Sequence, residues 1–90
     1  MSKLYSFSTR KYQHHIGFAL ARLTNLTCEA ENNGNQSQAN YYRQKHAELS
    51  ERAAVVFTDP VIVKVPYDTW KYLMAVKDWA VEQGSGIGYL

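Results

Sequence analysis

The 90-residue sequence is poor in cysteine and proline, with one Cys and two Pro. The single cysteine, Cys28, excludes an intrachain disulfide and fits a reducing compartment. No run of residues approaches the roughly 20 apolar positions that a membrane-spanning helix needs. The N-terminus also has no long apolar run of the kind found in secretory signals. We therefore expect a soluble, cytoplasmic protein that has no membrane partner.

Patterns that carry catalysis or bind metals are also missing. His14 and His15 are adjacent, and neighbours on a helix point about 100° apart, which makes them poor ligands for one ion. His46 stands alone, and no Cys-x-x-Cys or His-x-x-x-His spacing occurs. No serine lies in a nucleophile-elbow pattern, and the glycines of 84–88 do not open a helix as a phosphate loop does. We expect no catalytic residue, no metal site and no cofactor, and so a protein that is not an enzyme.

Apolar residues do recur at steps of three and four, in two segments separated by the polar loop Asn32–Gln36. This spacing places each set on one side of a helix and predicts helices over about 10–32 and 37–56. A short loop makes two such helices antiparallel neighbours. The members of the two sets are Tyr12, Ile16, Ala19, Leu20, Leu23, Leu26, Thr27 and Ala30, then Ala39, Tyr42, His46, Leu49, Ala53 and Val56.

The ends of these helices carry recognisable signals. Ser8 or Thr9 suits the cap of the first helix, and Ser37 suits that of the second. Gly34 suits the left-handed residue that ends a helix. On the exposed face of the second helix, Glu48 is spaced to form weak ion pairs with Lys45 and with Arg52.

Two short segments indicate a small β element. Residues 3–8 alternate loosely, and residues 61–65, after the turn Asp59-Pro60, are rich in β-branched side chains. Because one strand is not stable alone, 61–65 must pair with 3–8, with the tail segment 87–90 or with another chain. A third helix is expected over about 69–83, capped by Asp68 or Thr69, ended by Gly84 and followed by a tail, 84–90.

The predicted fold class is therefore α+β and mainly α, in a single domain, 1–90. It comprises an antiparallel helical hairpin, a third C-terminal helix and a β element of two or three strands. A chain this short buries a modest share of its surface, so oligomerisation is a natural way to bury more.

Small residues form a stripe along one side of the first helix: Gly17, Ala21, Thr24 and Cys28. A glycine inside a helix costs about 1 kcal/mol relative to alanine, and close packing of another backbone would offset that cost. On this interpretation Gly17 and Ala21 belong to a partner or oligomer interface, and Cys28 is a packing residue rather than a nucleophile. The alternative is that the small residues are simply tolerated there.

A basic stripe lies opposite the large apolar stripe of the first helix. The chain has no acidic residue before Glu29, and the helix macrodipole already makes the N-terminal half positive. Helix N-termini with basic neighbours bind phosphate, and aromatic and basic groups together suit single-stranded nucleic acid. The alternative is that Phe18 packs under residues 3–8 or the third helix while the bases form a solvated rim. The candidate anion or nucleic-acid site comprises Arg10, Lys11, His14, Phe18 and Arg22.

The third helix has two apolar faces separated by Lys77. The first face closes the core and comprises Tyr72, Leu73, Val76, Trp79 and Ala80. The second, made of Trp70, Met74 and Val81, exceeds what a small core needs, and exposed aromatics and methionine are typical interface anchors. The alternative is one broad buried face, past which Lys77 extends along its aliphatic stem.

We expect a small interaction protein that binds a larger protein of unknown identity or self-assembles, with a homodimer favoured. The expected contact residues are Trp70, Met74, Val81, Gly17 and Ala21. Short chains without chemistry of their own are often inhibitors or accessory proteins of phages or mobile elements, which is an expectation from size alone. The alternative function is nucleic-acid or nucleotide binding through the basic stripe, although a net charge of +2 and a pI near 8.7 are modest for it. A third possibility is an oligomer that binds a small molecule between chains.

Overall fold

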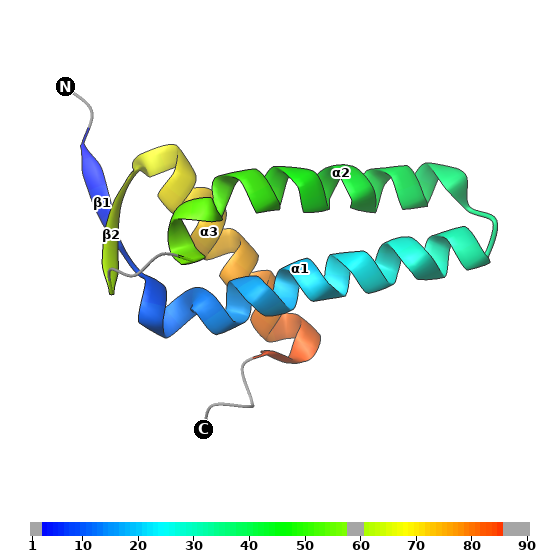
Figure 1. Ribbon diagram of the computed structural model, residues 1–90, viewed down its shortest axis with the longest axis horizontal. Helices are drawn as coiled ribbons and strands as arrows, with labels where there is room; N and C mark the ends of the chain where they lie inside the picture. The colour runs from blue at the N-terminus through cyan, green and yellow to red at the C-terminus, as the bar shows by residue number, and fades with distance from the viewer. Residues whose placement is uncertain (1–2, 58–60, 86–90) are drawn as a thin grey trace.

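The computed structural model describes residues 3–57 and 61–85 of the chain. The elements are β1 (Leu4–Ser8), α1 (Thr9–Asn32), α2 (Gln36–Arg52), the 3-10 helix η1 (Ala54–Phe57), β2 (Ile62–Pro66), α3 (Tyr67–Ala80) and the π-helical turn η2 (Val81–Ser85). Helices α1 and α2 form an antiparallel hairpin, the two strands lie at its open end, and α3 crosses its base (Figure 1). The predicted fold class, α+β and mainly α with a helical hairpin and a C-terminal helix, is confirmed.

Local capping chemistry sets the ends of the hairpin helices. Ser8 Oγ accepts a hydrogen bond from the Lys11 amide at 3.1 Å, as predicted. Gly34 has a φ of 74° in the left-handed region that favours glycine. The predicted cap of α2 at Ser37 is wrong, because Asn35 Oδ1 accepts from the Gln38 amide at 3.1 Å. Asparagine caps a helix as well as serine does, so α2 begins one residue earlier, at Gln36.

Helix α2 is shorter than its hydrophobic pattern predicts. It ends at Arg52 instead of reaching Val56, and residues Ala54–Phe57 form a separate 3-10 turn. Adjacent β-branched residues crowd the preceding helical turn, which disfavours continuing the helix there. The tighter turn keeps Val56 fully buried while Phe57 lies exposed, so the apolar position that suggested a longer helix still reaches the core.

The strands β1 and β2 pair antiparallel, with Leu4 opposite Pro66 and Ser8 opposite Ile62. Of the partners considered for the second strand, the N-terminal segment is thus the one that pairs with it. Phe7 and Val65 are buried and face the helices. The predicted turn Asp59-Pro60 and the tail from residue 86 onward lie outside the described residues.

Helix α3 starts earlier and ends earlier than expected. The predicted start at Asp68 or Thr69 is wrong, because Pro66, with φ −61° and ψ 157°, already has the extended geometry of a cap and helical residues begin at Tyr67. The α-helix ends at Ala80 instead of about residue 83, and a wider turn carries the chain to Ser85. Gly84, with a φ of 115°, bends the chain there, as its place in the sequence predicted.

The core lies where the base of the hairpin, the sheet and α3 meet. Its largest fully buried side chains are Phe7, Ile16, Leu49, Val56 and Leu73. Toward its loop the hairpin projects past α3 (Figure 1), and there Ala30 and Ala39 are the buried residues. Within the described part of the chain, no helix combines the length and apolar character needed to cross a membrane.

Candidate functional site

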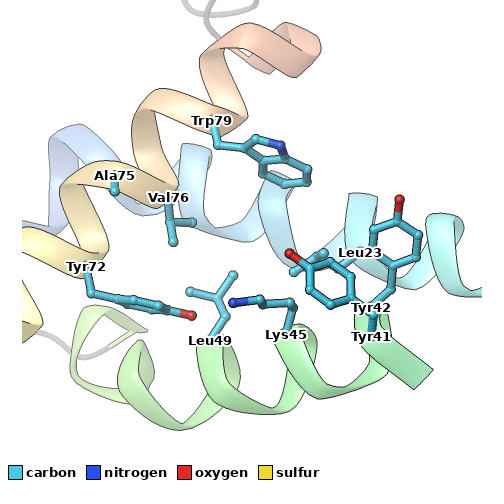
Figure 2. A pocket seen from close by; sticks show the side chains of 9 residues that line it. All are labelled: Leu23, Tyr41, Tyr42, Lys45, Leu49, Tyr72, Ala75, Val76 and Trp79. Atoms are coloured by element: carbon cyan, nitrogen blue, oxygen red, sulfur yellow. The ribbon is translucent and has the colours of Figure 1, made fainter. Parts of the chain in front are cut away.

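An aromatic groove lies between α2 and α3, beside the base of the hairpin. Its volume is about 270 Å³, and side chains from both helices bound it, with Leu23 of α1 at its floor (Figure 2). Trp79 and Val76 extend from α3, while Leu49 and Lys45 extend from the opposite helix. The lining residues are Leu23, Tyr41, Tyr42, Lys45, Leu49, Tyr72, Ala75, Val76 and Trp79.

The groove follows from how α3 crosses the hairpin. Leu73 and Ala80 point at the core and are fully buried. Tyr72, Val76 and Trp79 flank that buried line on one side and are half-buried. Because α3 crosses α2 at an angle (Figure 1), side chains on this flank cannot all be covered by the hairpin. A band of large apolar groups is therefore left partly open to solvent.

Two cations on α2 stand at the rim of the groove, each over a tyrosine ring. Lys45 Nζ is 5.5 Å from the Tyr41 ring centroid, and Arg52 Cζ is 4.9 Å from that of Tyr72. The predicted ion pairs of Glu48 with Lys45 and Arg52 are wrong: neither appears within 4 Å among the residues that the structure describes. The cations sit over ring faces instead, which attract positive charge.

The pKa of Tyr72, which lines the groove, is raised. Burial, together with the charge and hydrogen bond of the Glu48 carboxylate, raises the pKa of Tyr72 to about 12, and the positive charge of Arg52 acts in the opposite direction. At neutral pH the hydroxyl is protonated, as that of an ordinary tyrosine also is. Tyr72 thus lies beside the Glu48 charge and under the Arg52 guanidinium.

The predicted interface on α3 lies on the other flank of the helix, where Trp70 and Met74 are half-buried and pack against the core. The Trp70 ring lies 5.4 Å from the Tyr5 ring and 6.2 Å from the Tyr67 ring, measured between centroids. Val81, beyond them, is 43% exposed. Tyr5 of β1 thus contacts Trp70 of this face, whereas Val81 stays exposed.

Lys77, between the two faces, behaves as the alternative interpretation expects. Its side chain is 20% exposed, and its Nζ lies 2.6 Å from Asp78 Oδ1 and 5.5 Å from the Tyr12 ring centroid. The stem is buried while the charge reaches a carboxylate at the surface. The Lys77 stem therefore lies between two flanks of α3, of which one contacts β1 and the other lines the groove.

The stripe of small residues on α1 faces outward. Ala21, Thr24 and Cys28 are exposed, and a Cβ added at Gly17 would meet nothing within 4 Å. The expectation that Cys28 packs against a neighbouring element is wrong for the described chain, because Cys28 lies on the exposed side of α1. Gly17 and Ala21 are accessible for a contact with another molecule but take part in no helix packing here.

The residues of the predicted basic site have different surroundings. Arg10, His14 and Phe18 line a shallow depression together with Gly17 and Phe57. Arg10 and Lys11 are exposed, whereas Phe18 is half-buried and packs against the core, as the alternative interpretation expects.

Two residues of the basic stripe, His14 and Arg22, also contact η2. His14 Nε2 lies 3.2 Å from the Ser85 carbonyl oxygen, and Arg22 Nε donates to Gln83 Oε1 at 3.2 Å. Arg22 also lies 4.0 Å from a Glu29 carboxylate oxygen. Both side chains thus have partners within the chain, so the five residues do not converge on one anion site.

A buried pair next to this stripe was not predicted from the sequence. His15 and Ser85 are both buried, with 2.8 Å between His15 Nδ1 and Ser85 Oγ. Burial first, and then the nearby charges of His14 and Lys77, lower the pKa of His15. Since neither group is accessible, the pair fastens η2 to α1 rather than reaching a substrate.

The described residues contain no group of three or more His, Cys, Asp or Glu side chains that could hold a metal ion. No protein-family model matches this sequence, and no curated protein or solved structure matches it either.

Sequence reasoning assigned most groove residues to the core and did not single out Tyr41. Tyr42, Leu49, Tyr72, Val76 and Trp79 all fall on helical stripes, and a stripe does not reveal how much of it is covered. The available signal was the supply of aromatic residues, 13% of the chain, which provides many large groups able to make contacts.

Proposed function

We propose that this chain is a non-enzymatic interaction protein that docks a segment of a larger protein in the groove between α2 and α3. The observation that carries the proposal is the partly open band formed by Tyr41, Tyr42, Val76 and Trp79. Aromatic side chains at the centre of an interface supply much of its binding energy, because they bury a large area at small entropic cost.

The size and chemistry of the groove favour a polypeptide over a small molecule. Pockets for drug-sized ligands span about 300–1,000 Å³ and hold a few convergent polar groups. The groove has about 270 Å³ and a mainly apolar lining, which suits two or three anchoring side chains of a larger partner.

The test uses a photo-crosslinking amino acid placed at Ala75, which is exposed and lines the groove. Ala47 is the matched control, because it is an exposed alanine on α2 outside the groove. We expect crosslinking to a larger protein in the native cell from Ala75 and not from Ala47. The crosslinked segment, once purified, should bind the native chain and lose about tenfold or more in affinity with Trp79→Ala.

Two results would contradict the proposal. Equal crosslinking from both alanines would mean that the groove has no special role. Crosslinking from Ala75 to a second copy of the same chain would instead indicate self-assembly through the groove.

A further inference from the structure

The two cations at the rim of the groove are available to an external acid. Lys45 and Arg52 are exposed, and neither makes an ion pair with an acidic residue that the structure describes. Each instead lies over a tyrosine ring of the same rim. A carboxylate that arrives there can pair with either cation without breaking an existing salt bridge.

The separation of the two cations matches that of two side chains on a helix docked beside them. They are seven positions apart on α2, so they lie on the same side of that helix, two turns and about 10 Å apart. Two carboxylates separated by two turns of a second helix have the same separation and can meet both cations at once. An extended strand covers the same distance in about three residues, which leaves fewer side chains to fill the aromatic band between them.

Glu48 adds a constraint on what lies between the two contacts. It is exposed on α2 between Lys45 and Arg52, and its negative charge contributes to the raised pKa of Tyr72. Its negative charge repels a third acid placed midway between the other two. The rim therefore presents a positive, negative, positive pattern beside an apolar wall.

We propose that the docked segment is an amphipathic helix whose apolar residues enter the groove and whose two carboxylates, two turns apart, pair with Lys45 and Arg52. This inference rests on the proposed function, because it specifies the chemistry of the partner at the same groove. The apolar face supplies affinity, and the two acids set the register and direction of the helix.

The test uses three synthetic helical peptides that share one leucine-rich face. They differ at two edge positions, two turns apart, which are both glutamate, both glutamine or both lysine. Fluorescence anisotropy should show the glutamate peptide binding about tenfold more tightly than the glutamine peptide, and the lysine peptide more weakly still. The advantage of glutamate should shrink in high salt, because exposed charges are screened.

Charge exchange on the protein provides the second arm. Lys45→Glu with Arg52→Glu should reverse the order of the peptides, so that the lysine peptide binds best. The control is Arg10→Glu with Lys11→Glu, which changes the net charge equally at exposed positions outside the groove and should preserve the order. Circular dichroism and urea unfolding verify that both variants are folded.

Equal binding of the glutamate and glutamine peptides would overturn the inference, as would a preference that the control variant also reverses. Either result leaves the proposed function intact if Ala75 still crosslinks to a larger protein. Failure of all three peptides to bind would also overturn the inference, whereas absence of specific crosslinking from Ala75 would remove the proposed function itself.

Discussion

The two flanks of α3 carry the same kinds of residue but differ in what covers them. On one flank Trp70 packs against Tyr5 of β1, and on the other Trp79 lines the groove toward α2. Both tryptophans are half-buried and both contact the core. What separates them is a short strand that reaches one flank and not the other. Hydrophobic pattern alone therefore does not tell a structural tryptophan from one that is available to a partner.

The largest loss of stability is expected from truncating Leu73, which lies on the buried line between the two flanks. Leu73 is fully buried, and Leu73→Ala should lower the free energy of unfolding by about 3–5 kcal/mol, because it leaves a cavity under both flanks. Urea unfolding followed by circular dichroism measures the loss. A loss below about 1 kcal/mol would mean that α3 does not pack on the hairpin as described.

Truncating each tryptophan tests whether one flank of α3 is covered and the other is open. Trp70→Ala should cost about 2–3 kcal/mol of stability, because it removes the ring contacts with Tyr5 and Tyr67. Trp79→Ala should cost about 1–2 kcal/mol, because its ring borders an open groove, and should have the larger effect on partner binding. Equal losses of stability, or a reversed order, would contradict the distinction between a covered and an open flank.

The attachment of η2 to α1 should depend on pH. Since the pKa of His15 is lowered in the folded state, the unfolded chain takes up a proton first, and stability falls as pH drops below the ordinary value of 6.5. Urea unfolding between about pH 8 and pH 5 measures this, and His15→Gln should remove that part of the slope.

Ser85→Ala gives a companion measurement at constant pH. It removes the hydroxyl next to buried His15 Nδ1 and should cost about 1–2 kcal/mol at neutral pH. An unchanged urea midpoint would indicate that the contact between Ser85 and His15 adds nothing to stability.

The smallest effect is expected on the exposed side of α1, where Gly17→Ala should raise stability by about 0.5–1 kcal/mol. The added methyl meets nothing within 4 Å, and alanine favours the helical state. Thermal unfolding measures the gain. Because Gly17 also belongs to the predicted partner interface, weaker partner binding together with this gain would show that the small stripe is used by another molecule.

The helical hairpin was predictable because its signals are local. Stripes at steps of three and four, the capping serine before α1 and the glycine of the loop act within one or two turns. Element ends were less predictable where two local signals compete. At Val56 the apolar spacing favours a longer α-helix, whereas adjacent β-branched residues disfavour it, and a 3-10 turn also buries Val56.

The candidate site was not predictable in the same way, because tertiary contacts decide which face of a helix is covered by another element. Which flank of α3 meets β1 depends on the pairing of Tyr5 with Val65, 60 positions away in the chain. The buried contact of His15 with Ser85 likewise joins residues 70 positions apart. No periodicity within one helix records either arrangement.

The projecting part of the hairpin has a practical consequence. Near its loop, Ala30 and Ala39 are the buried side chains, and α3 and the sheet do not reach that far (Figure 1). A doubling of loop length costs only about 0.6 kcal/mol in closure entropy. The turn around Gly34 is thus a natural place to insert a fluorophore site or an epitope, which gives a reporter that stands clear of both flanks of α3.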